Sequence, residues 1–260
     1  MQNPTVLITG ASGGIGGCFA RLCAARKWNV VLVARDEAKL QTLAQELHTE
    51  THIFPVDLAD PLQIVKLKER LDAAHITIDI LINNAGFGSQ GAFAEQDLGH
   101  ELQMIDVNAR ALLHLTGLFL PAMAARGLGY ILNVASTAAF GPGPFMATYF
   151  ATKACVLSFS LALKEECRGT GVGITVLCPG PTATDFDRKA NAIGSFIFRG
   201  KLLAPMDVAR AGIEGMLKGK AIVIPGIKNR ILCFLPRIMP RPLVLAIGRR
   251  ILQKPPRPQA

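Results

Sequence analysis

Tyr149 and Lys153 are the two residues whose types and spacing most directly predict chemistry. On a helix, residues four apart lie on the same face, about 6 Å apart along the axis. A free phenol has a pKa of about 10 and is a poor base at neutral pH, but an adjacent ammonium stabilises the phenolate and lowers that pKa. The pair is therefore a candidate proton donor and acceptor for interconverting a carbonyl and an alcohol.

Ser136 is the next candidate, because it directly follows the apolar run Tyr130–Ala135. In a sheet of parallel strands, ligands bind at the carboxyl ends of the strands. A hydroxyl placed there can donate a hydrogen bond to the substrate oxygen that Tyr149 also serves. It would stabilise the charge that develops on that oxygen during the reaction.

A glycine cluster near the N-terminus predicts a phosphate-binding turn between a strand and a helix. It reads Thr9-Gly10-Ala11-Ser12-Gly13-Gly14-Ile15-Gly16, a Gly-x-x-x-Gly-x-Gly spacing. Glycines permit a tight turn and let backbone N–H groups and a helix N-terminus approach a pyrophosphate. The expected dinucleotide contacts in this turn are Gly10, Ser12, Gly13, Gly14, Ile15 and Gly16.

The elements that must position these residues alternate between strand-like and helix-like patterns. Strands are expected at Thr5–Thr9, Asn29–Ala34, His52–Val56, Asp79–Ile82, Tyr130–Ala135 and Gly173–Cys178. Helices are expected at Gly14–Lys27, Asp36–Leu47, Pro61–Ala74, Asp97–Arg126 and Tyr149–Arg168. Continuously apolar strands are typical of a sheet covered on both faces. The sequence thus predicts an α/β fold, a single Rossmann-type domain with a doubly wound parallel sheet and helices on both faces.

A set of motifs in this order resembles the short-chain dehydrogenases/reductases (SDR) over about residues 5–225. Besides the glycine turn and Ser136, the motifs are Asn83-Asn84-Ala85-Gly86, Asn108, Tyr149-Phe150-Ala151-Thr152-Lys153 and Pro179-Gly180-Pro181-Thr182-Ala183-Thr184. The resemblance implies an oxidoreductase acting on CH–OH or C=O groups with NAD(P). It implies Asn108, Ser136, Tyr149 and Lys153 as catalytic residues, with Asn108 holding a water that links Lys153 to solvent. It also implies a mobile substrate lid at about residues 185–204.

The end of the second strand distinguishes NADP from NAD. NAD enzymes of this layout place an acidic residue there to bind the ribose 2′-OH, but here Ala34 is followed by Arg35. Because a guanidinium can bind a 2′-phosphate by charge-assisted hydrogen bonds, we expect NADP (NADPH). Asp36 leaves NAD open as the alternative, since its carboxylate would either pair with Arg35 or reach the ribose.

The resemblance also implies the remaining cofactor contacts. Asp57 would accept a hydrogen bond from the adenine amine, and Thr184 would bind the nicotinamide carboxamide. The full set of further contacts is Asp57, Leu58, Asn84, Ala85, Gly86, Tyr149, Lys153, Pro179, Gly180, Thr182 and Thr184.

Composition excludes several classes of protein. Half of the 260 residues are apolar and 18% are charged, which favours a buried core over disorder. No run reaches the roughly 18 apolar residues of a membrane-spanning helix, and residues 1–10 do not resemble a secretory signal. The six cysteines form no Cys-x-x-Cys pair. We therefore expect reduced thiols, a cytoplasmic protein and no metal site.

Charge divides the chain into a near-neutral body and a basic C-terminal segment. The net charge is +9, yet residues 215–260 hold ten Lys and Arg and no Asp or Glu. We expect a catalytic domain at 1–225 and a basic, Pro/Arg-rich extension at 226–260, in which Pro242 opens a helix at Leu243–Leu252. The extension either contacts an anionic membrane surface or packs on the domain or a sister subunit. A nucleic-acid partner is not expected, because aromatic residues are nearly absent there.

The substrate pocket is expected to be apolar. Phe87, Phe140, Pro142, Phe145 and Met146 follow the motif residues, and an apolar segment runs from Phe186 to Phe198. These features favour an apolar carbonyl or alcohol substrate. Separately, we expect a homo-oligomeric enzyme, either a dimer or a tetramer. The alternatives are an NAD-dependent alcohol dehydrogenase of the same family and a non-catalytic nucleotide-binding scaffold. The intact catalytic set speaks against the scaffold.

Overall fold

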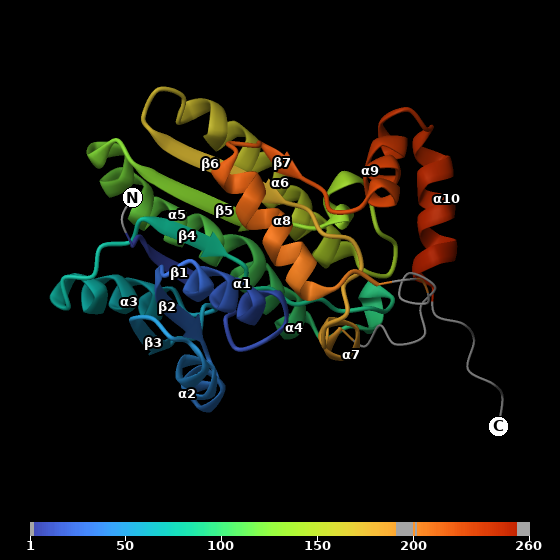
Figure 1. Ribbon diagram of the computed structural model, residues 1–260. Helices are drawn as coiled ribbons and strands as arrows, with labels where there is room; N and C mark the ends of the chain where they lie inside the picture. Colours follow the sequence, from blue (N-terminus) through green and yellow to red (C-terminus); the bar gives the residue numbers. More distant parts are fainter. Residues whose placement is uncertain (1–2, 191–199, 201, 254–260) are drawn as a thin grey trace.

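The computed structural model describes residues 3–190, 200 and 202–253. Within these residues the chain forms one sheet of seven parallel strands in the order β3-β2-β1-β4-β5-β6-β7 (Figure 1). The strands are β1 Thr5–Thr9, β2 Asn29–Ala34, β3 Thr51–Pro55, β4 Ile80–Asn83, β5 Gly129–Val134, β6 Val172–Leu177 and β7 Ile222–Val223. The strand order reverses between β1 and β4, which is the doubly wound arrangement. The predicted fold class is confirmed.

Helices cover both faces of the sheet, as the apolar strands require. Helices α1 (Gly14–Ala25), α2 (Glu37–Glu46) and α8 (Pro205–Leu217) pack on one face through Phe19, Leu40 and Ile213. Helices α3 (Pro61–Ala73), α5 (Ala111–Arg126) and α6 (Ala147–Glu166) pack on the other through Ile64, Leu115 and Leu163. The two apolar cores hold the sheet rigid, so the loops at its carboxyl edge have a fixed base.

The helix predicted at Asp97–Arg126 differs from a regular α-helix. It consists of α4 (Leu98–Ile105), a π-helical turn at Asp106–Arg110 and α5. A π-helical turn takes one residue more than an α-turn and commonly occurs at functional sites. Here it contains Asn108, whose buried side chain bonds the neighbouring loop. The periodicity of apolar residues does not reveal such a turn, so the sequence predicts one unbroken helix.

The C-terminal extension folds into two helices that stand beside the domain (Figure 1). They are α9 (Ile227–Phe234) and α10 (Arg241–Leu252), joined through a 3₁₀ turn at Leu235–Arg237. The second helix begins two residues earlier than predicted, with Pro242 in its first turn, where a missing N–H costs no hydrogen bond. No helix among the described residues is long and apolar enough to cross a membrane.

The lid expected at about residues 185–204 is described only in part. Helix α7 (Phe186–Lys189) follows Thr184, and Leu203 bridges back to Thr182. Residues 191–199 and 201 lie outside the described residues, and with them most of the apolar segment that was expected to follow Phe186.

Candidate active site

The carboxyl edge of the sheet brings the candidate residues together. Each group of candidate residues comes within two residues of the end of a strand. The glycine turn follows β1, Asn84 follows β4, Ser136 follows β5 and Pro179 follows β6. Since all strands are parallel, these loops converge on one edge of the molecule. This is the edge at which ligands bind in open α/β sheets.

Lys153 lies beneath the edge and is almost completely buried, at 4% exposure. Its Nζ donates a hydrogen bond to the carbonyl of Val134, the last residue of β5, at 3.0 Å. The same Nζ lies 5.8 Å from the centroid of the Tyr149 ring. The i, i+4 spacing thus places both side chains together as predicted, but the lysine is held by the strand rather than by the phenol.

Burial dominates the protonation of both groups. It raises the pKa of Tyr149 to about 12, against the opposing effect of a hydrogen bond with Ser136. It lowers the pKa of Lys153 to about 8, against the opposing effect of the neighbouring Cys178. The pKa of Tyr149 is thus raised and not lowered as expected, because desolvation of the phenolate outweighs the hydrogen bond with Ser136. At neutral pH Tyr149 therefore keeps its phenolic proton, as a proton donor must.

Asn108 ties the π-helical turn to the loop after β4. Its Oδ1 accepts a hydrogen bond from the Phe87 N–H at 3.0 Å, and its Nδ2 donates to the Phe87 carbonyl at 2.8 Å. A Cβ added at Gly86 would lie 3.0 Å from Asn108 Oδ1 and 3.2 Å from Lys153 Nζ. Glycine at position 86 therefore allows the loop to lie directly against both candidate catalytic residues.

The glycine turn has the shape of a phosphate cradle. Gly10 has a φ of +65°, and a Cβ there would lie 2.9 Å from Ala85 Cα. A Cβ at Gly16 would lie 2.2 Å from the Gly10 carbonyl oxygen. Only glycine fits these two positions.

The N-terminus of α1 is open toward the same side. Its cap residue is Gly13, no side chain caps the helix, and its first turn holds no acidic residue. The first N–H groups of the helix are thus available to an anion such as a pyrophosphate. Ser12 and Ile15 lie on either side of this helix start.

Thr9 is a structural residue of the site that sequence reasoning missed. Its Oγ1 accepts hydrogen bonds from the N–H groups of Asn84 and Ala85 at 2.9 and 3.0 Å. Asn84 Nδ2 returns a hydrogen bond to the Thr9 carbonyl at 2.9 Å. These bonds lock the loop after β4 onto the glycine turn. The available signal was a hydroxyl at the carboxyl end of a strand whose three central residues are apolar.

Arg35 and Asp36 behave differently at the end of β2. Arg35 is exposed, and no hydrogen bond or ion pair engages it within the described part of the chain. Asp36 caps α2 by accepting from Lys39 N–H at 3.0 Å, and it pairs with Lys39 Nζ at 2.8 Å. The possible Arg35–Asp36 ion pair is therefore not formed.

A small hollow lies next to these residues, between α1 and α2. Its volume is about 200 Å³, and Ser12, Gly13, Arg21 and Lys39 are among the residues that line it. The hollow joins the glycine turn to two basic side chains, and both are already paired, Arg21 with Glu46 at 2.6 Å and Lys39 with Asp36 at 2.8 Å.

The remaining expected cofactor residues lie around the same edge. Asp57 Oδ1 accepts from the Ala59 N–H at 3.0 Å, and Leu58 is buried. Thr182 Oγ1 donates to the Gly180 carbonyl at 2.8 Å, which fixes the turn after β6. A Cβ on Gly14 would lie 3.4 Å from Thr184 Cγ2, so Thr184 faces the glycine turn across the edge.

Phe186 covers Tyr149 on the substrate side. The two ring centroids are 5.2 Å apart, and a Cβ on Gly88 would lie 2.7 Å from the Phe186 ring. Two of the residues predicted to line the substrate pocket have other surroundings. Met146 is buried, and the centroid of the Phe145 ring lies 5.9 Å from the guanidinium carbon of Arg249. The described surface next to Tyr149 is aromatic, and it narrows the access to the phenol.

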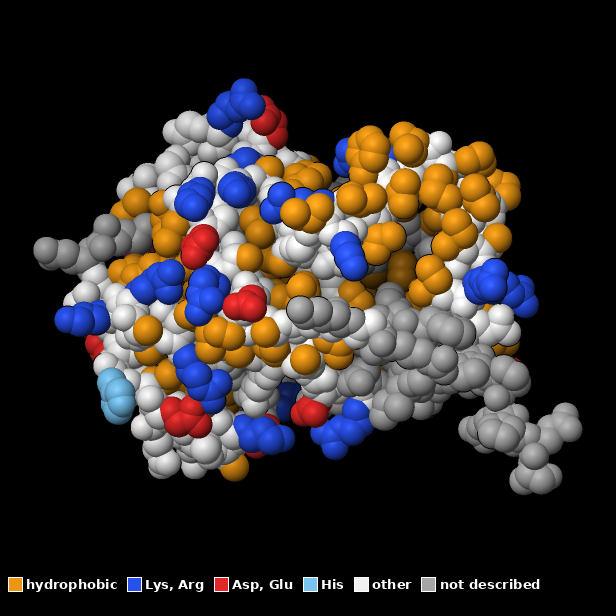
Figure 2. Space-filling model, turned by 45° about the vertical axis from the view of Figure 1, so that its right-hand side comes forward, with side chains coloured by type: hydrophobic (Ala, Val, Ile, Leu, Met, Phe, Trp, Pro, Cys, Tyr) orange, Lys and Arg blue, Asp and Glu red, His pale blue; other side chains and the backbone are white. Residues whose placement is uncertain are grey.

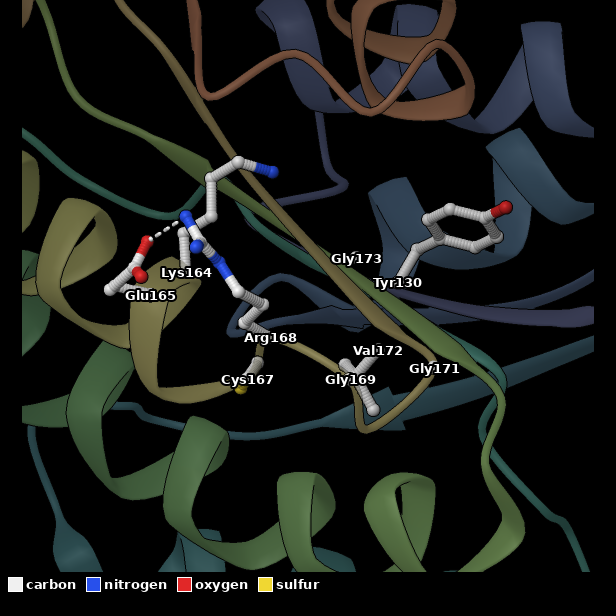
Figure 3. Close-up of a pocket in the computed structure, with 9 residues that line it drawn as sticks. All are labelled: Tyr130, Lys164, Glu165, Cys167, Arg168, Gly169, Gly171, Val172 and Gly173. Carbon is white, nitrogen blue, oxygen red and sulfur yellow. Dashed lines mark hydrogen bonds and ion pairs between the residues drawn. The ribbon is translucent and has the colours of Figure 1, made fainter.

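A hollow of about 350 Å³ lies elsewhere, beside the first residues of β5 and β6 (Figure 3). It is lined by Tyr130, Lys164, Glu165, Cys167, Arg168, Gly169, Gly171, Val172 and Gly173. The amino ends of parallel strands lie at the edge opposite Ser136, and Arg168 is already paired with Glu165 at 2.9 Å. This hollow contains none of the candidate residues and is not part of the site.

Comparisons with known proteins agree with this geometry. A model of the family described as short chain dehydrogenase matches residues 4–193. The ketoacyl reductase HetN of Nostoc sp. is 36% identical over 183 residues, which are 69% of this chain and 64% of that protein. The chain thus spans just under two thirds of that relative's length.

Two further proteins are similar over larger shares of their own length. The NADP-dependent 3-hydroxy acid dehydrogenase YdfG of Escherichia coli is 37% identical over 177 residues, or 67% of this chain and 71% of that protein. Among solved structures, a short-chain dehydrogenase from Sphingobium yanoikuyae in complex with NADPH is 32% identical with a TM-score of 0.80. The superposition covers 86% of this chain and 88% of that one.

Proposed function

The chain belongs to the short-chain dehydrogenase family, a family of oxidoreductases, and we propose that it interconverts a carbonyl and a secondary alcohol with NADP(H). The observation that carries the proposal is the cluster of Ser136, Tyr149 and the buried Lys153 at the carboxyl edge of the sheet. It lies beside a helix N-terminus that no side chain caps. A proton-transfer group next to an open anion site is what reduction by a dinucleotide needs.

The roles of the residues follow from their surroundings. In reduction, Tyr149 donates its phenolic proton to the substrate oxygen, because burial keeps the phenol neutral. Ser136 donates a hydrogen bond to the same oxygen and stabilises the charge on it. Lys153 supplies a positive charge close to the Tyr149 ring. The proton relay through a water held by Asn108 stays a prediction from the family resemblance.

The residues of the glycine turn fit a dinucleotide. Gly10 and Gly16 allow the backbone of the turn to pack more closely than any side chain would permit, and the start of α1 would bind the pyrophosphate. NADPH, when bound, supplies the hydride. Arg35, which is exposed at the end of β2, would bind the 2′-phosphate. The engagement of Asp36 by Lys39 argues against its use as a ribose ligand.

The cofactor choice is tested with Arg35→Ala. Loss of the guanidinium should weaken NADPH binding by about 2 kcal/mol, roughly thirtyfold, and leave NADH binding unchanged. Fluorescence titration of both cofactors measures this. An equal loss for NADPH and NADH would show that Arg35 supports the fold instead, and would return NAD as the candidate.

The proposed substrate is an apolar ketone or the corresponding secondary alcohol. The aromatic contact between Phe186 and Tyr149 supports an apolar group near the reacting carbon. The similar proteins are named for ketoacyl and 3-hydroxy acid substrates, which also carry the reacting oxygen on a secondary carbon. The direct test is NADPH oxidation over a panel of ketones of increasing size and polarity. Absence of turnover on the whole panel, with NADPH bound, would favour the non-catalytic scaffold.

The proposal includes the organisation of the whole chain. Residues 1–225 form the catalytic unit, residues 226–260 an extension of it, and the enzyme is a homo-oligomer. Support for the oligomer comes from α4, where Leu98, Leu102 and Ile105 lie at helical spacing and are 61%, 52% and 42% exposed. A stripe of this kind on a folded protein marks an interaction surface.

A further inference from the structure

The two C-terminal helices have distinct inner and outer sides. The inner side of α10 contains Val244, Gly248 and Leu252, which recur every four residues. A Cβ on Gly248 would lie 3.2 Å from Pro144, and the buried Leu252 accepts a hydrogen bond from Gln90 through its carbonyl. Helix α9 is anchored by Cys233, which is 3% exposed. The α9–α10 hairpin, residues 227–252, is therefore fixed to the domain.

The outer side of the hairpin is apolar. Along α9 and the turn after it, Ile227, Ile231, Phe234 and Ile238 recur at helical spacing and are 74%, 56%, 55% and 67% exposed. On α10, Leu243, Ile247 and Ile251 are 48%, 41% and 39% exposed. Figure 2 shows hydrophobic side chains gathered over the corner of the molecule where these helices lie. Single exposed apolar residues are normal, but a gathered patch marks a binding surface.

The hairpin that bears this patch is basic, and acidic residues are missing from its sequence. The hairpin carries Lys228, Arg230, Arg237, Arg241, Arg249 and Arg250, and residues 215–260 contain no Asp or Glu. If a second copy of the chain docked on the patch, the basic residues of the two hairpins would lie close together and repel each other. An anionic lipid surface instead offers phosphates to the basic residues and an acyl region to the apolar ones. We propose that the α9–α10 hairpin docks the protein on an anionic lipid surface.

The hairpin contacts the loops that surround the candidate active site. Pro144 and Phe145 precede Tyr149 in the chain, and Gln90 follows the loop after β4. A Cβ on Gly180, in the turn after β6, would lie 2.5 Å from Asn229 of α9. Docking through the hairpin would bring the substrate entrance near the bilayer, where an apolar ketone partitions. This consequence rests on the proposed function, whereas lipid binding itself does not.

Vesicle co-sedimentation of the full-length protein tests the docking. We expect binding to phosphatidylcholine vesicles that contain phosphatidylserine, weaker binding to phosphatidylcholine alone, and loss of binding as salt is raised. Each basic residue near an anionic surface contributes about 1 kcal/mol, equivalent to about fivefold in partitioning. Lys228→Glu with Arg250→Glu should therefore lower partitioning at least about 25-fold. Ile231→Ser with Phe234→Ser should also lower it.

Matched substitutions on the opposite side of the molecule serve as controls. Lys66→Glu and Leu62→Ser change exposed residues of α3, where Leu62 is 68% exposed, and should leave binding unchanged. Thermal unfolding and NADPH titration show that each variant is folded, and neither measurement needs turnover. Lipid binding can thus fail while the proposed enzyme activity holds, or hold while the activity fails.

Three results would overturn the proposal. The first is wild-type protein that stays in the supernatant with phosphatidylserine vesicles at low salt. The second is binding that the hairpin variants lower no more than the α3 controls do. The third is a lipid-free dimer that Ile231→Ser with Phe234→Ser dissociates, because the patch would then bind a second copy of the chain.

Discussion

Two neighbouring side chains, Tyr149 and Lys153, determine the chemistry at the scale of single residues. Without a bound cofactor, burial favours the neutral form of both, with pKa values of about 12 and about 8. A neutral phenol is ready to donate a proton, whereas alcohol oxidation requires that the phenolate be stabilised. The positive charge that Lys153 carries below pH 8 is the residue's contribution to that stabilisation.

Tyr149→Phe should remove turnover and retain cofactor binding. The phenyl ring keeps the contact with Phe186 and only the hydroxyl is lost, so the site keeps its shape. Positioned acid–base groups contribute about 10²–10⁴-fold, and kcat for ketone reduction should fall within that range. Steady-state kinetics and NADPH titration on the same preparation measure both quantities. A variant that retains more than about a tenth of kcat would rule out Tyr149 as the proton donor.

Lys153→Met should change how stability depends on pH. Below about pH 8 the Lys153 amine is charged in both the folded and the unfolded state, and the folded state carries the full cost of burying it. Between about pH 8 and 10.5 the folded protein has released the proton and the unfolded chain has not. The unfolded state binds more protons in this range, so the wild-type free energy of unfolding should rise with pH by about 3 kcal/mol.

The Met variant lacks this titration, and below about pH 9 Tyr149 stays protonated in both the folded and the unfolded state, so its own titration does not enter there. The difference in stability between Lys153→Met and wild type should therefore be most favourable to the variant below pH 8 and shrink above it. Urea unfolding at a series of pH values measures the difference. A difference that does not vary with pH would mean that Lys153 is not buried as a charged group.

The sequence predicted which residues would gather but not how their surroundings would act on them. The spacing of Tyr149 and Lys153 determines that they share a helix face. The bond from Lys153 to the Val134 carbonyl and the direction of the Tyr149 pKa depend on burial by distant segments. The role of Thr9 was missed for the same reason, since its partners Asn84 and Ala85 are about 75 residues away in the chain.

At the scale of elements, the π-helical turn at Asp106–Arg110 is the feature that most affects the site. It places the Asn108 amide where it bonds both the N–H and the carbonyl of Phe87. Asn108 Nδ2 also donates a hydrogen bond to Thr152 Oγ1 at 3.2 Å. Three elements thus meet at one buried amide. Apolar periodicity predicts a helix over Asp97–Arg126, but a local change of pitch stabilised by contacts outside the helix leaves no pattern in the sequence.

Asn108→Ala should destabilise the protein and release the loop after β4. The substitution removes three hydrogen bonds and leaves the Phe87 N–H and carbonyl without these partners. Lost buried bonds of this kind cost about 1 kcal/mol each, so the free energy of unfolding should fall by about 2–4 kcal/mol. Urea unfolding measures the loss. Hydrogen exchange should show faster exchange of the Phe87 amide, and unchanged exchange there would contradict the anchoring role.

At the scale of the whole molecule, the pattern of apolar residues in the sequence predicts most of the buried sheet and its helices. It does not predict how the C-terminal helices pack on the domain. Strands β1 to β6 and helices on both faces were predicted because buried runs have a characteristic length and spacing, whereas the two-residue strand β7 and helix α8 were not predicted. The α9–α10 hairpin was predicted only as a basic, apolar extension with one short helix. Its packing on Pro144, Gln90 and Gly180 could not be read from the sequence, because those contacts join segments far apart in the chain.

The exposed stripe of α4 leads to the last prediction, which concerns assembly. Leu102 lies at the centre of the stripe with 52% exposure, between Leu98 and Ile105. If two copies bury this stripe against each other, wild-type protein is at least a dimer. Leu102→Glu should then yield a monomer at the same concentration, because a carboxylate would have to be desolvated in the interface. Light scattering after size-exclusion chromatography measures the mass.

Leu217→Glu on α8 is the matched control, because Leu217 is 45% exposed and lies outside the stripe. This variant should keep the wild-type mass. Loss of the oligomer in both variants would point to a general effect of the added charge, and its persistence in Leu102→Glu would exclude α4 as the interface. Since α4 continues through the π-helical turn that contains Asn108, an interface on α4 would also stabilise that turn. The monomeric variant should therefore unfold at a lower urea concentration than wild type.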